Sequence, residues 1–313
     1  MPHREPQSAG AVFMVRPARF GFNPETAPTN AFQGGSACVS AQAIQAAALA
    51  EFDAVAAALR AAGVEVIVGQ DTAAPAKPDA IFPNNWVSFH RDGSLVLYPL
   101  HAPNRRPERR EELIEQLLHE GRFGVVRTVD LRHREAAGQF LEGTGSLVLD
   151  RASRVAYACL SPRTDLDVLG EFAQRLDYDL VPFEATDESG TPVYHTNVLM
   201  AVGTRFAIVC GEAIGAPGQR DEVYRRLALT GHELIEITRA QMRAFAGNSL
   251  ELECAGVHTI AVSESAWEAL EVAQRAALQR HGRILRAAIP TIERHGGGGI
   301  RCMLAEIHLP RRA

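Results

Sequence analysis

Residues 41–68 read AQAIQAAALAEFDAVAAALRAAGVEVIV, and the order of structure that this stretch predicts recurs along the chain. Its first part, Ala41–Ala62, predicts a helix, because alanine has the highest intrinsic helix propensity. Gly63 ends this helix, since the residue after a helix is often left-handed and glycine adopts that conformation at little cost. The run Val64–Val68 then predicts a strand, because valine and isoleucine are favoured in strands.

Four later stretches show the same order of helix, turn residue and strand. The expected helices begin at Pro107, near Asp165, after Pro217 and near Glu264, and the strands that follow them are Phe123–Val129, Leu180–Phe183, Glu233–Ile237 and Ile284–Ile289. The turns at Gly63, Gly121, Asp177, Gly231 and Gly282 are separated by 58, 56, 54 and 51 residues. A near-constant period is typical of repeat architectures, so the spacing predicts an α/β fold of five units. The alternative is an ordinary α/β protein, in which helix, glycine and strand also alternate at such intervals.

The length and composition narrow the class of protein. Five units account for the 313 residues without a linker, so we expect a flexible N-terminal tail over residues 1–10 and a single domain over residues 11–313. The content of 46% hydrophobic and 22% charged residues is that of a soluble globular protein. A net charge of −5 argues against binding nucleic acid through its phosphates. Since we find neither an apolar run of ~18 residues nor a secretory signal, we expect no membrane contact and a cytoplasmic location.

The cysteines and histidines lie too far apart for the common metal-binding motifs. The five cysteines are Cys38, Cys159, Cys210, Cys254 and Cys302, with no CxxC pair among them, and no two histidines are closer than 11 residues. These spacings exclude zinc-ribbon and HExxH motifs and favour a reducing compartment. The glycine-rich motifs of nucleotide-binding loops are also absent. We therefore expect neither a metal nor a cofactor.

One chemically versatile residue follows each turn at a similar distance. Asn85, Glu142, His195, Asn248 and Cys302 lie 17–22 residues after the five turn positions. If the units pack around a common axis, these side chains converge on one central site. Such a site would contain a thiol nucleophile, an imidazole that can shuttle protons and a carboxylate that can orient one of them.

Cys302 is the candidate nucleophile among the cysteines. It follows Gly296–Gly299, and four glycines permit close backbone approach and loop movement beside a reactive atom. The other cysteines are expected to be structural. The alternatives for Cys302, His195 and Glu142 are an inert buried thiol, a satisfied core histidine and an exposed turn residue.

In their order along the chain these residues resemble the guanidino-group-modifying superfamily, which includes arginine deiminase, dimethylargininase, succinylarginine dihydrolase and the amidinotransferases. The resemblance extends from Met14–Pro17 to Cys302–Glu306. It implies the pentein fold, an α/β propeller of five ββαβ units around a pseudo-fivefold axis. It also implies that Cys302 is the nucleophile, His195 the acid and base, and Glu142 the catalytic carboxylate.

Two arginines are implied as contacts of the substrate's amino-acid end. His101–Glu108 resembles the family's RPG…SRRxE stretch, in which Arg105 is the matching position. Leu160–Asp165 resembles its SxRTN stretch and implies that Arg163 binds the substrate carboxylate. A guanidinium suits this role because it donates two parallel hydrogen bonds to a carboxylate. The alternative for both arginines is a solvated surface charge.

The segment that faces the reacting group departs from the arginine-processing members. Pro78–Asn85 is similar to the family's PDxxFxxD segment, which implies Asp79, Asn84 and Asn85 as substrate contacts. Those members have aspartate at the last position and often in an HxD motif, where this chain has Asn85 and Asn197. An amide both donates and accepts hydrogen bonds, so it suits a neutral ureido group, whereas burying a guanidinium without a counter-charge would be costly. With its FPNNW and YHTNV motifs, the sequence most resembles the citrulline-utilisation hydrolase branch.

The sequence therefore predicts a hydrolase of non-peptide C–N bonds that converts citrulline and water to ornithine, carbon dioxide and ammonia through a covalent thiolate adduct. Arginine or methylarginine deiminases and dihydrolases, and amidinotransferases, are the alternatives within the family. A non-catalytic pentein is the alternative from another class, but it is expected to lack the Cys, His and Glu positions, and this chain has all three. The expected partner is a small amino-acid substrate, and the sequence leaves a homo-oligomer open.

Overall fold

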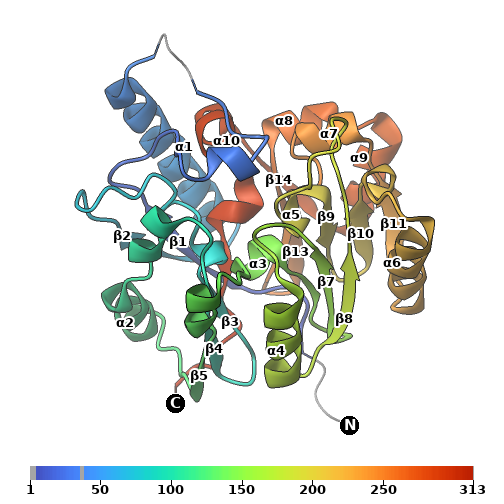
Figure 1. Cartoon of the computed structure of the whole chain (residues 1–313), viewed down its shortest axis with the longest axis horizontal. Helices are drawn as coiled ribbons and strands as arrows, with labels where there is room; N and C mark the ends of the chain where they lie inside the picture. The colour runs from blue at the N-terminus through green and yellow to red at the C-terminus, as the bar shows by residue number, and fades with distance from the viewer. Residues whose placement is uncertain (1–4, 36–38, 313) are drawn as a thin grey trace.

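Five three-stranded sheets form the framework of the computed structural model, which describes residues 5–35 and 39–312 (Figure 1). In each sheet the middle strand is antiparallel to one neighbour and parallel to the other. For example, β3 (Val87–Phe89) pairs antiparallel with β4 (Ser94–Leu97), and β4 pairs parallel with β5 (Arg127–Asp130). The helix α2 (Glu111–Glu120) lies between the two parallel strands in the chain, because a parallel pair requires a crossover connection.

Three further units repeat this ββαβ order. The second unit consists of β6 (Val148–Asp150), β7 (Val155–Cys159), α4 (Leu166–Leu176) and β8 (Asp179–Phe183). The third unit consists of β9 (Met200–Val202), β10 (Phe206–Val209), α6 (Pro217–Leu229) and β11 (Glu233–Glu236). The fourth unit has two helices and consists of β12 (Leu250–Cys254), β13 (Val257–Ser263), α8 (Glu264–Ala269), α9 (Val272–His281) and β14 (Arg283–Ala287). Each unit keeps one antiparallel and one parallel pair.

The fifth unit joins the two ends of the chain. Here β1 (Ala11–Arg16) pairs parallel with β2 (Glu65–Gln70) across the helix α1 (Ala41–Ala61), and antiparallel with β15 (Ala305–Glu306). The first strand of each unit lies nearest the centre, where β15 contacts β3, β6 contacts β9, and β9 contacts β12. The predicted α/β fold of five ββαβ units around a pseudo-fivefold axis is therefore confirmed.

The predicted turn residues end their helices in two different ways. Gly63, Asp177 and Gly231 are left-handed, with φ of 90°, 57° and 83°. Gly121 has φ of −83° and Gly282 is extended at 176°, so neither needs a left-handed conformation. Gly121 is instead restricted by space, because an added Cβ would lie 2.2 Å from the Phe123 ring.

Two predicted helix bounds are wrong. Pro107 does not begin α2 but lies inside a 3₁₀ segment, Pro103–Glu108. The chain leaves the helical conformation at Arg109 and is extended at Arg110 before α2 begins. The helix expected from Glu264 to Gly282 is divided in two. It breaks at Leu270, which is buried, and Glu271 then begins α9 with a capping box.

Residues 5–10, expected to belong to a flexible tail, pack against the sheets. Gln7 donates hydrogen bonds from Nε2 to the carbonyl oxygens of Leu149 (2.8 Å) and Val202 (3.0 Å). Ala9 accepts a hydrogen bond from the backbone N–H of Glu253 at 3.0 Å. These contacts reach β6, β9 and β12, so this segment covers one end of the central strands. The rest of the expected tail, residues 1–4, lies outside the described residues, as does Cys38.

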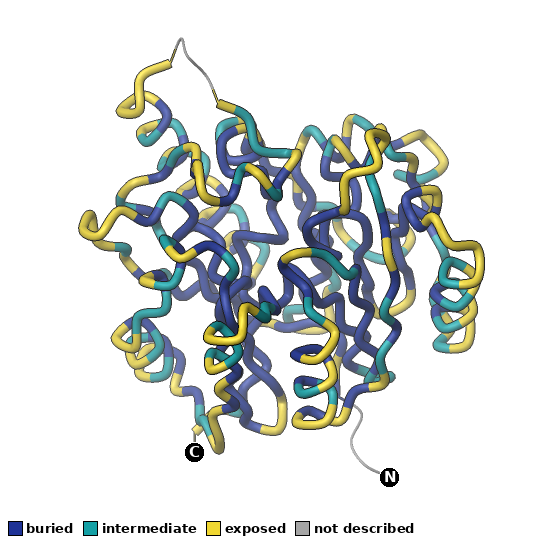
Figure 2. The backbone as a smooth tube through the Cα atoms, viewed as in Figure 1, coloured by how far each residue is buried: buried dark blue, intermediate teal, exposed yellow. Residues whose placement is uncertain are grey.

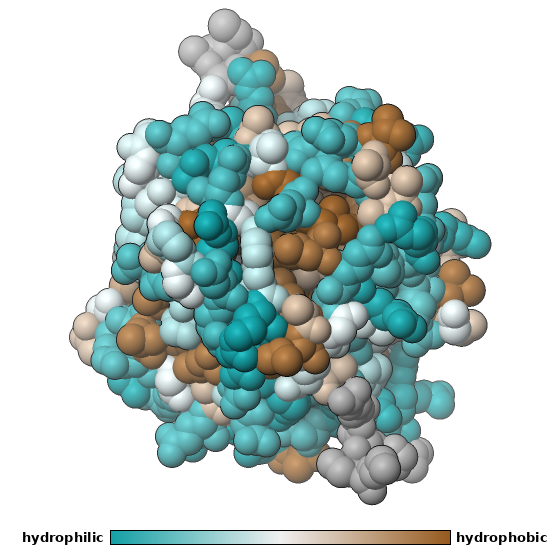
Figure 3. All heavy atoms as spheres, turned by 90° about the vertical axis from the view of Figure 1, so that its right-hand side faces the viewer, coloured by the Kyte–Doolittle hydropathy of each residue, from teal (hydrophilic) through white to brown (hydrophobic). Residues whose placement is uncertain are grey.

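The strands form the interior and the long helices the outside, as the burial pattern in Figure 2 shows. Four clusters of buried apolar side chains fill the space between helices and sheets. Hydrophilic residues cover most of the face in Figure 3, with apolar patches between them. Among the described residues, no helix combines the length and the apolar character needed to span a bilayer.

Candidate active site

The predicted central residues lie just before the innermost strands. Short helical turns precede four of these strands: η2 (Pro83–Asn85) before β3, α3 (Gly143–Ser146) before β6, α5 (Thr196–Leu199) before β9, and η6 (Ile300–Met303) before β15. Asn85 and Cys302 lie within such turns, whereas Glu142 and His195 are the N-caps of α3 and α5. The structure thus gives these residues equivalent places around the axis.

Glu142 is the electrostatic centre of the site. Its side chain is completely buried, and its Oε1 accepts a hydrogen bond from the backbone N–H of His101 at 3.0 Å. Its Oε2 lies 2.8 Å from His195 Nε2, 3.5 Å from Arg163 Nη1 and 3.6 Å from Arg105 Nη1. Burial alone raises the pKa of Glu142, but the charge of Arg163 and the hydrogen bond with His195 outweigh it, so the pKa falls well below its usual range. Glu142 is therefore an ionised carboxylate.

His195 is neutral near pH 7. Burial lowers its pKa to about 4, although the contact with Glu142 works in the opposite direction. An ionised carboxylate only accepts hydrogen bonds, so His195 Nε2 must be the protonated nitrogen. The other nitrogen, Nδ1, is then free to act as a base.

Cys302 lies on the same pocket, with its thiol held by two amides. Its Sγ accepts hydrogen bonds from Asn248 Nδ2 at 3.3 Å and from Asn197 Nδ2 at 3.5 Å. Burial raises the pKa of the thiol, and the two amide donors and Arg301 only partly offset this effect. Within the described part of the chain no hydrogen bond joins Cys302 to His195, although both line the pocket. The other three described cysteines are unpaired and lie elsewhere, at Cys159, Cys210 and Cys254.

Arg105 is buried in a pair with Glu108. Its Nε and Nη2 each donate a hydrogen bond of 2.9 Å to the Glu108 carboxylate, and its Nη1 donates one of 2.9 Å to Asn85 Oδ1. Burial raises the pKa of Glu108 to about 7, although Arg105 lowers it. Arg105 therefore reaches the pocket, but its hydrogen-bonding groups already have protein partners.

Arg163 likewise has partners within the protein. Its Nη2 donates to the backbone oxygen of Thr26 at 2.9 Å and to Thr29 Oγ1 at 2.7 Å, and its guanidinium lies 4.9 Å from the centre of the Tyr194 ring. Arg163 thus connects Glu142 to the loop after β1. Both arginines line the pocket, and neither is the solvated surface charge of the alternative reading.

The remaining predicted substrate contacts, Asp79, Asn84 and Asn197, are also buried, but their side chains have different hydrogen-bond partners. Asp79 Oδ2 accepts a hydrogen bond from Asn23 at 2.7 Å, whereas its Oδ1 has no partner among the described residues. Asn84 Oδ1 accepts a hydrogen bond from Asn85 Nδ2 at 3.2 Å, and the Asn84 side chain is completely buried. Asn197, expected beside the substrate, directs its amide to the thiol of Cys302 instead.

The loop after β1 covers the site and was not predicted from the sequence. Thr26 and Asn30 of this loop line the pocket, together with Phe82, Tyr194 and the segment 296–298. The signal for this loop is the run of polar residues that begins at Asn23, after the first strand. The space left between these groups is narrow, with room for about one water molecule.

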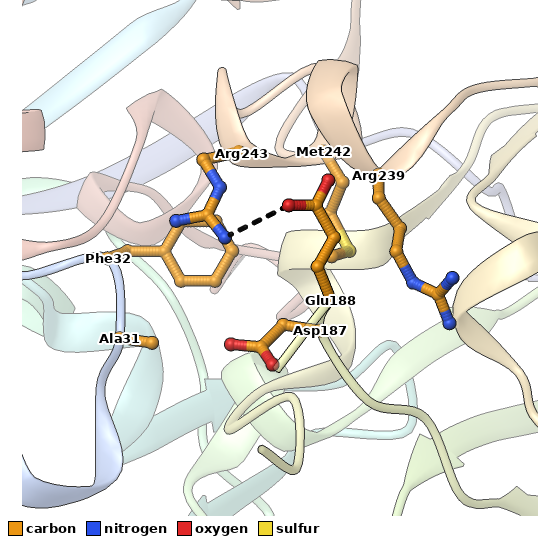
Figure 4. Close-up of a pocket in the computed structure, with 7 residues that line it drawn as sticks. All are labelled: Ala31, Phe32, Asp187, Glu188, Arg239, Met242 and Arg243. Carbon is orange, nitrogen blue, oxygen red and sulfur yellow. Dashed lines mark ion pairs between the residues drawn. The ribbon is translucent and has the colours of Figure 1, made fainter. Parts of the chain in front are cut away.

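A second hollow lies on the same loop, outside this site. Figure 4 shows its lining residues, Ala31, Phe32, Asp187, Glu188, Arg239, Met242 and Arg243. An ion pair of 3.8 Å joins Arg243 to Glu188, and the Phe32 ring also packs 5.9 Å from that of Tyr194. The lining of this hollow contains neither a cysteine nor a histidine. Across the described residues, no cluster of three or more His, Cys, Asp or Glu side chains could hold a metal ion.

Comparisons with known proteins agree with this architecture. A comparison with curated proteins found no match. Among solved structures, the N-terminal domain of ArgZ, an arginine dihydrolase from the ornithine-ammonia cycle in cyanobacteria, is 17% identical, with a TM-score of 0.73 over 96% of this chain and 99% of its own. Unliganded AgrE is 18% identical, with a TM-score of 0.74 over 97% of this chain and 40% of its own. A dimethylarginine dimethylaminohydrolase carrying an adduct with S-methyl-L-thiocitrulline is 16% identical, with a TM-score of 0.64 over 96% of this chain and 100% of its own. At these identities the likeness shows the fold.

A family model identifies the family itself. The model of the eukaryotic N,N dimethylarginine dimethylhydrolase family matches residues 16–309, which contain all the predicted site residues. The match covers nearly the whole chain, and the five-unit fold is that of the structures above. The chain therefore belongs to this hydrolase family, within the pentein superfamily of guanidino-modifying enzymes.

Proposed function

We propose that this chain is a cysteine-dependent hydrolase of a ureido amino acid, and that L-citrulline is its substrate. The products are ornithine, carbon dioxide and ammonia, at the expense of one water molecule. Within the family, this proposal depends on one feature: the group that the pocket offers to the reacting end of the substrate.

The orientation of Asn85 carries the proposal. Arg105 can only donate hydrogen bonds, so the Asn85 atom 2.9 Å from its Nη1 must be the carbonyl oxygen. The amide nitrogen of Asn85 is consequently turned the other way, where one of its hydrogens bonds Asn84 Oδ1 and the second remains available. Asn85 thus offers a donor to the pocket. A donor suits the carbonyl oxygen of a ureido group, whereas a guanidinium has only donors of its own.

Arginine is the second candidate, and a different observation favours it. Among the described residues, buried Asp79 Oδ1 has no hydrogen-bond partner, although Arg105 Nε lies 3.7 Å from the other oxygen, Oδ2. A carboxylate oxygen that is free in this way would suit the positive charge of a guanidinium. The structural neighbours also include ArgZ, an arginine dihydrolase, and AgrE, which has been crystallised with L-arginine and with ornithine. A ureido NH can use the same oxygen as acceptor, however, so Asp79 is compatible with both substrates.

The proposed mechanism uses the neutral thiol and the neutral imidazole of the resting site. His195 Nδ1 takes the proton of the Cys302 thiol as the sulfur attacks the ureido carbon. The protonated His195, stabilised by Glu142, then gives this proton to the departing nitrogen as the C–N bond breaks. Water attacks the carbon of the S-bound intermediate, His195 takes a proton from it, and the S–C bond breaks. His195 then returns this proton to the sulfur. The carbamic acid that is released loses carbon dioxide without a second water, which breaks the remaining C–N bond, so the overall reaction consumes one water.

A substrate comparison tests the proposal. Purified protein is incubated with citrulline, arginine and methylated arginines, and ornithine, citrulline and ammonia are measured. We expect ornithine from citrulline in the wild type and none from Cys302→Ser, while Cys210→Ser, which removes a buried thiol outside the site, retains activity. Ornithine formation that survives Cys302→Ser would exclude the nucleophile. A kcat/KM for arginine above that for citrulline would exclude citrulline as the preferred substrate.

A further inference from the structure

Asn248 contacts the sulfur of Cys302 directly and has no role in the mechanism above. It precedes β12 at the fifth place around the axis, and its side chain is completely buried. Its Nδ2 lies 3.3 Å from Cys302 Sγ and 2.9 Å from the backbone oxygen of Asn197. The two hydrogens of this amide nitrogen therefore have one partner each.

The orientation of the Asn248 amide is determined by its other end. Asn248 Oδ1 accepts a hydrogen bond from the backbone N–H of Arg301 at 3.0 Å. A flipped amide would place NH₂ against this N–H, and two donors would then face each other. The glycine at position 299 leaves room for this amide, because an added Cβ there would lie 2.6 Å from Asn248 Oδ1. Asn248 can only donate to the sulfur.

Asn197, the second amide at the sulfur, is less restricted. Its Nδ2 lies 3.5 Å from Cys302 Sγ, but its Oδ1 lies 3.8 Å from the same atom and could accept the S–H proton. Asn197 can therefore hydrogen-bond to the sulfur as a thiol or as a thiolate. A fixed donor such as Asn248 favours the thiolate alone, since hydrogen bonds to a charged form stabilise that form.

Before the reaction begins, His195 gives the sulfur no positive charge. His195 is neutral near pH 7. Arg301 directly precedes Cys302 in the chain, but its guanidinium donates hydrogen bonds to Glu306 Oε2 at 2.6 Å and to the backbone oxygen of Leu304 at 2.7 Å. Burial disfavours a thiolate, so direct donors to the sulfur have to supply much of its stabilisation.

We infer that Asn248 is a catalytic residue that stabilises and aims the Cys302 thiolate through a single fixed N–H···S hydrogen bond. The inference rests on the proposed role of Cys302 as nucleophile, but not on the identity of the substrate. It can be measured on the free enzyme, because alkylation of a cysteine proceeds through the thiolate.

The test compares the pH dependence of Cys302 alkylation by iodoacetamide, followed by mass spectrometry of the Cys302 peptide without substrate. Asn248→Asp keeps an acceptor for the Arg301 N–H and replaces the donor with an oxygen. We expect this variant, and Asn248→Ala, to be alkylated at least about tenfold more slowly at pH 8, with a profile shifted to higher pH. Gln241→Ala, which removes a buried amide outside the pocket, should give the wild-type profile.

Folding and function are read separately. Circular dichroism and thermal unfolding establish which variants are folded. If Asn248→Ala does not fold, Asn248→Asp alone provides the test. An unchanged alkylation profile in a folded Asn248 variant would overturn the inference. A shifted profile in an enzyme that does not hydrolyse citrulline would support the inference and count only against the proposed substrate.

Discussion

Glu142 Oε2 lies 2.8 Å from His195 Nε2, and both side chains are almost completely removed from solvent. The contact fixes which imidazole nitrogen carries the proton, so Nδ1 is the nitrogen that can act as a base. It also places a negative charge beside an imidazole that becomes positive in the proposed mechanism. Because Arg163 and Arg105 flank the same carboxylate oxygen, the Glu142 carboxylate stays ionised although it is buried.

Replacement of Glu142 by glutamine should impair catalysis more than binding. Glutamine has one acceptor oxygen, so it cannot accept from both His195 and the backbone N–H of His101. We expect kcat to fall by about 10²-fold or more, the range of general acid–base effects. Because two buried arginines lose a counter-charge, the free energy of unfolding should also fall by about 3 kcal/mol. Steady-state kinetics and urea unfolding measure the two effects, and a kcat within twofold of the wild type would contradict the assignment.

Replacement of Gly145 by alanine should damage the site by filling it. A Cβ at this position would lie 2.5 Å from Asn85 Nδ2 and 2.7 Å from His195 Nδ1, so both side chains would have to move. We expect a loss of kcat of about 10²-fold, since a displacement of about 1 Å can cost that much. The control is Gly170→Ala on α4, where an added Cβ meets nothing within 4 Å. This control should keep wild-type kinetics and gain about 0.5 kcal/mol of stability.

The sequence predicted those parts of the fold that depend on local signals. Helix-ending residues recur at near-constant spacing, so the five units could be counted before any contact was known. The split between α8 and α9 has a weaker signal, because it depends on Leu270 reaching the core. The position of Pro107 was misread because proline is typical of the first turn of a helix, whereas Pro107 lies inside a 3₁₀ segment that ends at Glu108, before α2 begins at Glu111.

The site was predictable as a set of positions but not as a set of contacts. Cys302, His195 and Glu142 converge because they precede equivalent strands. Sequence could not show that Asn197 turns its amide to the thiol, or that Glu108 occupies the guanidinium of Arg105. These are choices of side-chain orientation among residues distant in sequence, and only the packed structure determines them.

The substrate preference should respond to a single change at Asn85. Aspartate at this position would pair with Arg105 through its carboxylate and present an acceptor to the pocket in place of a donor. If the proposed function holds, Asn85→Asp should lower kcat/KM for citrulline and raise it for arginine, with a shift in their ratio of about tenfold or more, or about 1.4 kcal/mol. Asn85→Ala is the matched variant, because it removes the donor without adding an acceptor. It should lower citrulline turnover with no gain for arginine, and an unchanged ratio in Asn85→Asp would refute the role of this amide.

Acid should destabilise the protein partly through His195. In the unfolded chain a histidine titrates near its ordinary pKa of 6.5, whereas burial lowers the pKa of His195 in the folded protein to about 4. Between these values the unfolded state binds the extra proton, so stability falls as the pH decreases from about 6.5 to 4. Burial also lowers the pKa of His90 and His308, which adds to this slope. Glu108 acts in the opposite sense: its pKa is raised to about 7, so the stability that it contributes is lost as the pH rises from about 4.5 through 7.

A difference between variants isolates the contribution of His195 from these other groups. The free energy of unfolding in urea is measured from pH 7.5 to 4.5 for the wild type and for His195→Gln. Below pH 6.5 the wild type should lose up to about 1.4 kcal/mol per pH unit more than His195→Gln, the value for one proton, and about 2.5 kcal/mol more by pH 4.5. His119→Gln, on the exposed side of α2, should keep the wild-type slope. Parallel curves for the wild type and His195→Gln would contradict a lowered pKa of His195 in the folded protein.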